Sequence, residues 1–365
     1  MKQEVYKPVN LFLSKFLSDF IKFFWKIFVW RKFNLPTNLD CISSIVVLEY
    51  HCIGDVILVA PALNIIRNNF PKASITLVTN QPVHELAQAA AIADKVVSIS
   101  IPWIHNIGSP QKWISFCKQI ISLRKSNFNL GFNFKGDFRD LGLLRWINPD
   151  IRVGFNATGG DFFLTHVYPF PFEKHQVDRA IHLLYLFGLL TDNHSPTLSL
   201  PIAVNYQQDH KTHIIIHGGA AHPFRMWPDN HWLTLIELLQ PHACVTVVDV
   251  SETLELCNLV KEQSPNTKVF KGSLLDFSQQ LKIQSLLIGL DSMAVHLAIA
   301  VGIPAIALFG SQNPELTKPY GSNGYVITPP SICKHKKTNW RLCKDCMSEI
   351  DPHTVYDTAT KICSL

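Results

Sequence analysis

Short apolar runs alternate with helical patterns along most of the chain, in two successive series. The runs that match buried strands cover 42–48, 74–79, 95–99 and 129–134 in the first half, and 212–217, 244–250, 285–289 and 305–309 in the second. Between them, apolar residues recur three or four positions apart, which predicts helices. Strands that alternate with helices predict an α/β fold with parallel sheets. We therefore expect two Rossmann-like, doubly wound domains facing a cleft.

Residues 291–320 contain the clearest of these β-α-β units. An apolar strand over 285–289 leads to Asp291, Ser292 is placed to cap the following helix, and a second apolar strand ends at Gly310. Both strands thus end in polar residues. Ligands of open parallel sheets bind at these carboxyl ends, and a helix N-terminus there favours an anion such as a diphosphate.

Length and composition fit a globular protein of two domains. The 365 residues are 47% hydrophobic and 17% charged, and the net charge of +5 is too small to indicate a nucleic-acid partner. Nine scattered cysteines, without a cleavable signal peptide, indicate reduced thiols and the cytoplasm. The expected segments are an N-terminal helix with its linker (1–38), a first domain (39–200), a second domain (201–350) and a last helix that crosses back to the first domain (351–365).

The segment over 9–33 has the most unusual composition. Its polar residues lie three or four apart on one helical face, and the remainder is Leu, Phe, Ile and Trp; the polar set is Ser14, Lys15, Ser18, Asp19, Lys22 and Lys26. Four charged residues between Leu11 and Trp30 argue against a membrane-spanning helix. A signal peptide would also need a small-residue cleavage site, and the segment has none. The pattern favours an amphipathic helix on a membrane surface, with a core helix packed on the first domain as the alternative.

Two polar positions follow strands in the first half. Asp55 lies where a strand turns into a helix, so its carboxylate can face the cleft; an Asp after Gly also often only caps a helix. Arg139, in the stretch KGDFRD, suits a phosphate or carboxylate, although a lone loop Arg is more often solvated.

Three positions in the second half suit a nucleotide. The consecutive N–H groups of Gly218 and Gly219 could cradle a phosphate, although most Gly pairs are simple turns. Glu252, after the strand over 244–250, is placed either to accept a hydrogen bond from a ribose hydroxyl or to complement a helix dipole.

Four motifs in this order resemble glycosyltransferase family 9, the ADP-heptose:lipopolysaccharide heptosyltransferases and their relatives. They are GDVILVAPALNIIRNNFPKASITLV from Gly54, KGDFRD from Lys135, RMWPDNHW from Arg225 and DSMAVHLAIAVGIPAIALFG from Asp291. The pieces RVGF (152–155), FFLTH (162–166) and HQVDRAIHLLYLFGLL (175–190) also follow the family's order, as does a cysteine-rich piece past Gly321. The whole ordered set covers roughly 42–362, which makes it more specific than each motif alone. This chain departs from the usual pattern at two places: Met293 replaces a Gly, and Glu49, Tyr50 and His51 occupy positions where many members carry an Arg.

The resemblance implies the glycosyltransferase B fold and an inverting, metal-independent transfer. A nucleotide-sugar, ADP-heptose, is the expected donor, and a lipopolysaccharide core or related lipid-linked glycan at the inner face of the bacterial inner membrane is the expected acceptor. Asp55 is then the general base, Gly54 and Arg139 contact the acceptor, and Arg225 neutralises the departing diphosphate. The other expected donor-binding residues are Gly218, Gly219, Glu252, Asp291, Ser292, Met293, His296 and Gly310.

No cofactor and no metal are expected. A C-x-x-C pair, Cys343 and Cys346, lies near Cys333, but the spacing matches no common zinc site, and the family carries a similar cysteine-rich piece.

Two other function classes stay open. A catalytically inactive relative that binds lipid-linked glycan would explain Met293 and the missing Arg, while the retained Asp55, Arg225 and His296 argue against it. A dinucleotide-dependent oxidoreductase would need Gly-x-Gly-x-x-Gly after a first strand, and neither half has this motif.

Overall fold

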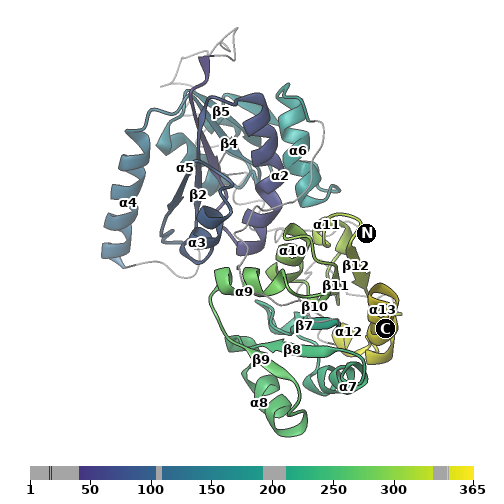
Figure 1. The fold of residues 1–365 in the computed structure, drawn as a ribbon. Helices are drawn as coiled ribbons and strands as arrows, with labels where there is room; N and C mark the ends of the chain where they lie inside the picture. Colours follow the sequence, from purple (N-terminus) through teal and green to yellow (C-terminus); the bar gives the residue numbers. More distant parts are fainter. Residues whose placement is uncertain are drawn as a thin grey trace. The chain divides into compact units, whose positions relative to one another are not determined.

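The chain folds into two compact units, divided after His194 (Figure 1). The computed structural model describes Phe16, Ser18 and residues 41–103, 109–191, 211–331, 343 and 345–365. Each unit contains one six-stranded sheet. Every strand pairing in these ranges is parallel. The predicted α/β class with two Rossmann-like sheets is thereby confirmed.

The sheet of the first unit runs in the order β3-β2-β1-β4-β5-β6. Its strands are β1 (Ser44–Leu48), β2 (Ser74–Thr79), β3 (Lys95–Ser98), β4 (Leu130–Asn133), β5 (Ile151–Phe155) and β6 (His166–Tyr168). The chain winds outward from β1 to β3 and then returns to place β4 on the other side of β1. The carboxyl ends of β1 and β4 therefore flank the topological switch point of this sheet, where open α/β sheets bind ligands.

Helices cover both faces of this first sheet (Figure 1). They are α2 (Ile53–Asn69), α3 (Gln81–Ala89), α4 (Pro110–Arg124), α5 (Phe138–Ile147) and α6 (Gln176–Leu186), with a short 3-10 turn η2 (Asp161–Phe163). Helices α2 and α6 pack together on one face. On the other face, α4 and α5 bury Phe116, Ile120 and Leu144 against Val46 and Leu48 of β1. The central strand is thus apolar on both faces, as its sequence predicts.

The sheet of the second unit repeats this connectivity, in the order β12-β11-β10-β7-β8-β9. Its strands are β7 (His213–His217), β8 (Cys244–Val248), β9 (Lys268–Phe270), β10 (Leu286–Leu290), β11 (Ala305–Leu308) and β12 (Gly324–Ile327). Here the switch point lies between β7 and β10, which pair directly.

Figure 1 shows α9 and α10 on one side of this second sheet and α7 and α8 on the other. The helices are α7 (Asp229–Leu239), α8 (Leu254–Gln263), α9 (Leu274–Leu281), α10 (Met293–Ala300), α11 (Pro314–Thr317), α12 (Asp345–Ser348) and α13 (Pro352–Cys363), with 3-10 turns η3 (Pro223–Arg225) and η4 (Ser251–Thr253). Trp227 and Trp232 are fully buried, with their rings edge to face at 4.7 Å between centroids. The Trp227 indole N–H donates to the Ile350 carbonyl at 3.1 Å, which ties the C-terminal segment to this core.

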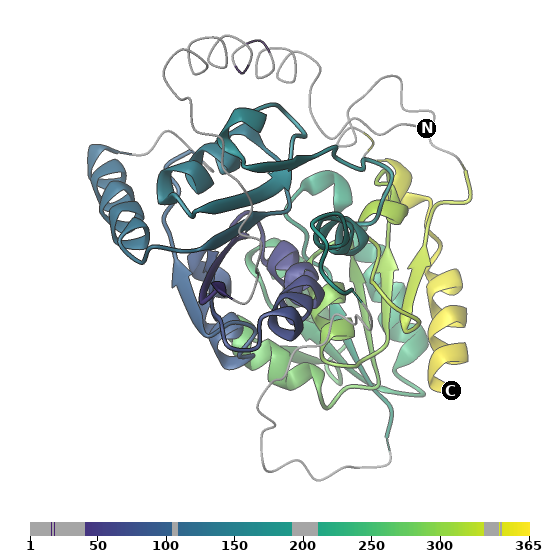
Figure 2. The ribbon, with the colours of Figure 1, turned by 90° about the horizontal axis from the view of Figure 1, so that it is seen from above.

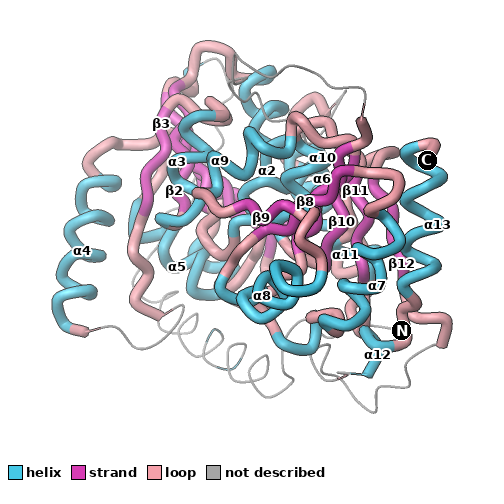
Figure 3. The backbone as a smooth tube through the Cα atoms, turned by 60° about the horizontal axis from the view of Figure 1, so that its bottom comes forward, coloured by secondary structure: helices cyan, strands magenta, loops and turns pink. Residues whose placement is uncertain are grey.

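The last helix differs from its expected position. The sequence analysis expected it to cross back to the first domain, but α13 belongs to the second unit and packs on α7 (Figure 3). Val355 and Ala359, one turn apart on α13, are fully buried in the core that contains Trp227 and Trp232. Burial of this apolar stripe against a neighbouring helix explains where α13 docks.

The predicted N-terminal amphipathic helix lies outside the described residues, apart from Phe16 and Ser18. Ser18 is buried, and its hydroxyl accepts a hydrogen bond from the Gly160 N–H at 2.9 Å. The Phe16 side chain, from the apolar set, is 64% exposed. Across the described parts of the chain, every helix is too short or too polar to cross a bilayer.

Candidate active site

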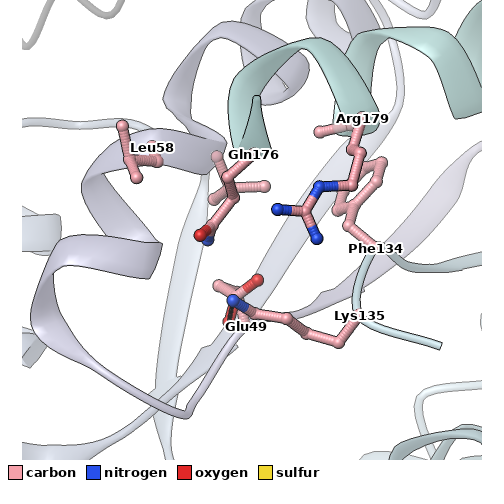
Figure 4. Close-up of a pocket in the computed structure, with 8 residues that line it drawn as sticks. Glu49, Leu58, Phe134, Lys135, Gln176 and Arg179 are labelled. Carbon is pink, nitrogen blue, oxygen red and sulfur yellow. Dashed lines mark ion pairs between the residues drawn. The ribbon is translucent and has the colours of Figure 1, made fainter. Parts of the chain in front are cut away.

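Polar side chains gather at the carboxyl edge of the first sheet, beside its switch point. Glu49 follows β1, Lys135 follows β4, Asp55 lies in the first turn of α2, and Gln176 is the first residue of α6. Figure 4 shows the Lys135, Glu49, Gln176 and Arg179 side chains converging on one small pocket. The topology therefore brings together residues that are far apart in the sequence.

Asp55 is held by two side chains from other elements. The Lys135 ammonium lies 2.9 Å from one carboxylate oxygen, and the Gln176 amide donates to the other oxygen at 2.7 Å. Asp55 does not take the cap position of α2, which belongs to Cys52. The carboxylate thus faces the switch point, as the sequence analysis expected of a base.

The ion pair fixes the charge of both partners. Burial alone would raise the pKa of Asp55, but the Lys135 charge and the Gln176 hydrogen bond outweigh it and lower the pKa. Burial likewise opposes the charge of Lys135, yet the carboxylates of Asp55 and Glu49 raise its pKa. Near neutral pH, Asp55 is a carboxylate that can accept a hydrogen bond from an incoming hydroxyl.

Glu49 is the most perturbed carboxyl group of this cluster. Its side chain is 2% exposed, and desolvation raises its pKa to about 7, against the opposing charge of Lys135. The Lys135 ammonium lies 3.9 Å from the nearer Glu49 oxygen, Oε1, which accepts no hydrogen bond among the described residues. At neutral pH this carboxyl group is therefore close to half protonated.

Asp140 organises the two residues that follow Glu49. Its buried carboxylate accepts a hydrogen bond from the Tyr50 hydroxyl and lies 2.8 Å from His51 Nε2. The Tyr50 and His51 rings stack, with 4.6 Å between centroids. Burial would lower the pKa of His51, but the hydrogen bond and the charge of Asp140 raise it. Where many family members carry an Arg, this chain thus holds a His paired with Asp140.

Arg139, a predicted acceptor contact, is the second residue of α5, at the same edge. Its guanidinium is paired with Asp137, the N-cap of α5, through an Nε–Oδ1 distance of 2.9 Å. The Arg139 side chain is 54% exposed, so it is accessible to a soluble anion. Gly54, the other predicted acceptor contact, directly precedes Asp55 in the first turn of α2.

A second ion pair lies at the switch point of the second sheet. Arg225 ends the η3 turn after β7, and Asp291 follows β10. The Arg225 Nη1 lies 3.3 Å from Asp291 Oδ2 and donates to the Asp291 carbonyl oxygen at 3.1 Å. Burial raises the pKa of Asp291, and the charge of Arg225 opposes this rise. Two predicted donor residues are thus in direct contact.

The start of α10 completes this group. Ser292 occupies the N-cap position, but its hydroxyl makes no capping hydrogen bond, contrary to the expectation from sequence. Within the described parts of the chain, this Oγ atom is buried without a partner. An unpartnered buried hydroxyl is costly unless a ligand satisfies it, and a helix N-terminus favours an anion. Met293 is the first residue of α10, and His296 is buried one turn later.

The predicted phosphate-binding glycines are also constrained by packing. A Cβ atom on Gly219 would lie 2.8 Å from a Val250 methyl group, and one on Gly310 would lie 2.7 Å from the Met347 sulfur. A Cβ atom on Gly218 would approach the Trp232 indole nitrogen to 3.2 Å. A Cβ atom at any of these positions would therefore require the neighbouring side chains to move. Glu252 is exposed just after β8, in the η4 turn.

One of the C-terminal cysteines, Cys346, lies beside Gly310. Cys346 is buried in α12 next to Met347. Among the described residues, no group of three or more His, Cys, Asp or Glu side chains is arranged to hold a metal ion. Cys333 lies outside those residues.

Three of the residues described above were not singled out as site residues by the sequence analysis. Lys135 and Asp140 stand in the KGDFRD motif, where only Arg139 was chosen, and Gln176 stands 121 positions from Asp55. The motif itself was the available signal for the first two. Gln176 stands in the stretch HQVDRAIHLLYLFGLL (175–190), but its contact with Asp55 depends on the packing of α6 beside α2, which the sequence pattern does not give.

Replacing Glu49 with Gln should change how stability depends on pH. In the folded state the pKa of Glu49 is about 7, so the carboxyl group keeps its proton up to that pH. In the unfolded chain Glu49 has the ordinary pKa of a solvated glutamate, 4.5, and releases its proton there. The free energy of unfolding should therefore fall with rising pH across this window in the wild type. In Glu49→Gln this fall should shrink by on the order of 2 kcal/mol, given about 1.4 kcal/mol per pKa unit.

Urea unfolding of the first unit at pH 5 and pH 8 measures this difference. The exposed Glu173, replaced by Gln, provides a matched control that should behave like the wild type. Equal pH dependence in Glu49→Gln and the wild type would contradict the assignment of a protonated Glu49.

Comparison with known proteins gives one family. The sequence model of glycosyltransferase family 9 (heptosyltransferase) matches residues 117–344. Lipopolysaccharide heptosyltransferase 3 of Escherichia coli is 22% identical over 302 residues, which cover 76% of this chain and 85% of that protein.

Two solved structures share the fold. The glycosyl transferase family 9 protein of Veillonella parvula superposes with a TM-score of 0.74 at 20% identity, over 89% of this chain and 98% of that chain. The E. coli heptosyltransferase WaaC with ADP-2-deoxy-2-fluoro heptose gives a TM-score of 0.70 at 17% identity, over 87% of this chain and 99% of that chain. The family match spans more than half of the chain, and the ordered motifs and the paired Rossmann-like sheets agree with it, so this chain belongs to glycosyltransferase family 9, the heptosyltransferase family.

Proposed function

We propose that the protein transfers heptose from ADP-heptose to a lipopolysaccharide core or a related glycan, with inversion at the anomeric carbon. The observation that carries this proposal is the Asp55 carboxylate, held by Lys135 and Gln176 at the switch point of the first sheet. The name of the E. coli relative supports the acceptor class, and the bound analogue in the WaaC structure supports the donor.

The first unit supplies the base. Asp55 accepts the proton of the acceptor hydroxyl as the oxygen attacks the anomeric carbon and the bond from that carbon to the diphosphate oxygen breaks. Gln176 and Lys135 fix the orientation of the carboxylate, and the Lys135 charge keeps it ionised until the proton arrives. Arg139 and His51 add two cationic or hydrogen-bonding groups at this edge, which suits an acceptor that carries phosphate or carboxylate.

The second unit supplies the charge for the leaving group. Arg225, the N–H groups at the start of α10 and the buried Ser292 hydroxyl all present donors to a diphosphate. Negative charge grows on the diphosphate as the sugar departs, so donors that are already in place stabilise the transition state. These groups carry out the role that a divalent cation has in other glycosyltransferases, and we infer a transfer that needs no metal.

We propose further that the enzyme works on the cytoplasmic face of the inner membrane, held there by the segment over 9–33. Two described residues of that segment support this proposal. Ser18, from its polar set, is buried, and Phe16, from its apolar set, is exposed. The apolar side of an amphipathic helix in the membrane plane faces the lipid, and the exposed Phe16 belongs to that side of the pattern.

Asp55→Asn should abolish transfer and leave the affinity for ADP nearly unchanged. The amide cannot take the proton of the acceptor hydroxyl, but it is nearly isosteric with the carboxylate. Transfer to a glycan acceptor and titration with ADP measure the two effects, with the exposed Asp150→Asn as a matched control. Wild-type turnover in Asp55→Asn would rule out this base, and an intact wild type that transfers nothing would favour the inactive glycan-binding relative.

Arg225→Ala should weaken ADP binding by roughly 1.5–3 kcal/mol, the usual range for a hydrogen bond to a charged group. Adenosine, which has no phosphate, should bind equally to both forms, and EDTA should leave transfer intact. Arg225→Ala also leaves Asp291 buried without its partner, so Asp291→Asn is combined with it as a control. Equal losses for ADP and adenosine in that double variant would mean that Arg225 supports the fold and not the diphosphate.

Removing residues 1–33 should strongly weaken the binding of the protein to anionic vesicles and spare transfer to a soluble, delipidated acceptor. Salt should also weaken the binding of the full chain, because ions screen the attraction of Lys15, Lys22 and Lys26 to lipid. Vesicle co-sedimentation at rising ionic strength measures both effects. A truncated protein that unfolds and still binds vesicles would place this segment in the core.

A further inference from the structure

Helix α4 has a buried face that is clearly separate from its outer face. Phe116, Ile120 and Leu123 are 5% exposed or less and pack under the helix, against the sheet and α5. These three residues account for the docking of α4, so the core does not require apolar residues elsewhere on it.

The outer face of α4 nevertheless carries large apolar side chains beside its polar and basic ones. Ile114 is 57% exposed and Ile121, two turns later, is 48% exposed. Trp113 of α4 is 38% exposed, and Trp146 of α5 is 39% exposed. Both rings contact the Phe116 ring edge to face, at 6.1 and 5.8 Å between centroids. Leaving four large apolar side chains in contact with water on one patch is unfavourable, and such patches commonly bind a partner.

The charged side chains of α4 and its C-terminal cap are all basic. Exposed basic residues alternate with the apolar ones, at Lys112, Lys118, Arg124 and Lys125, and 109–127 contains no Asp or Glu. At helical spacing, Ile114, Lys118, Ile121 and Lys125 form one outward line. The Arg124 guanidinium donates to the Trp146 carbonyl at 3.2 Å, which links the α4 charges to the aromatic residue on α5.

Within the described parts of the chain, the outer face of α4 is exposed to solvent. The helix lies at the outer side of its unit in Figure 1, Figure 2 and Figure 3. It covers the face of the sheet opposite to α2 and α6, which carry Asp55 and Gln176. The patch is therefore separate from the candidate active site, and substitutions on it leave the catalytic groups in place.

We propose that the outer face of α4, together with Trp146, is a docking surface for an anionic lipid bilayer. Trp and Ile enter the boundary between head groups and acyl chains, while Lys and Arg contact the lipid phosphates. A protein partner would have to complement a surface that has several cations and no anion on its helix, whereas an anionic membrane supplies that complement everywhere. This contact is a second one, distinct from the segment over 9–33, and it does not depend on which sugar is transferred.

Two pairs of substitutions in the full chain test the two kinds of contact. Ile114→Ser with Ile121→Ser removes the apolar contact, and Lys118→Gln with Lys125→Gln removes the charge. On α8 of the second unit, Leu254→Ser with Lys261→Gln alters an exposed apolar and an exposed basic residue and serves as the matched control. Co-sedimentation uses vesicles of phosphatidylcholine with about one third phosphatidylglycerol and, in parallel, of phosphatidylcholine alone.

Each α4 pair should lower the partition coefficient on the anionic vesicles about tenfold, and the control should bind like the intact chain. ADP affinity and thermal stability should be unchanged, which separates this result from a failure of the proposed transfer. Combining an α4 pair with removal of residues 1–33 should lower binding below that of either change alone.

Two results would overturn the proposal. One is α4 variants that bind anionic vesicles as the intact chain does. The other is an intact chain that light scattering finds to be a dimer in solution, with monomeric α4 variants, because the patch would then be an interface between copies.

Discussion

The parallel pairing of β1 with both β2 and β4 is the constraint on which the first unit depends. Parallel strands are joined by crossovers, and each crossover returns the chain to the same end of the sheet. The carboxyl ends of all the strands therefore lie at one edge of the sheet. Because β2 and β4 lie on opposite sides of β1, the segments that follow β1 and β4 diverge at this edge. The second unit repeats the same order around β7 and β10. Every polar group discussed for catalysis lies at one of these two edges.

Both switch points contain an ion pair between the segments that follow the two central strands. In the first unit, Asp55 lies after β1 and its partner Lys135 after β4. In the second, Arg225 lies after β7 and its partner Asp291 after β10. A buried charge is costly unless it is paired, so each pair keeps a charged group at an edge where burial would otherwise neutralise it. The order of the signs differs: a carboxylate follows the first central strand in one unit, and a guanidinium follows it in the other.

That difference suits the two halves of a sugar transfer. The first edge offers an ionised carboxylate to a hydroxyl, and the second offers positive charge to a diphosphate. Met293 and the absent Arg near Asp55 are departures from the family pattern, but Lys135 provides a cation beside Asp55. At the same edge, the hydrogen bond with Asp140 raises the pKa of His51 against the effect of burial. Docking on lipid would act separately, by holding the enzyme where a lipid-linked acceptor is concentrated.

The sequence by itself determined the elements and part of the sites, because periodicity and turn residues act locally. Apolar runs marked eight of the twelve described strands to within two residues, while β5, β6, β9 and β12 were not predicted as strands. Polar residues that follow two of these runs marked Asp55 and Asp291, and Arg225 was chosen because of its motif. Only the tertiary structure decided the partners. Asp55 meets a lysine from beyond β4 and a glutamine from α6, Asp140 holds a tyrosine 90 positions away, and α13 stays with the second unit. Such contacts depend on strand order and helix packing, and the protonation of Glu49 depends on burial. No local sequence pattern encodes these contacts or the pKa of Glu49. Both arise only when segments distant in the sequence pack against one another and exclude water.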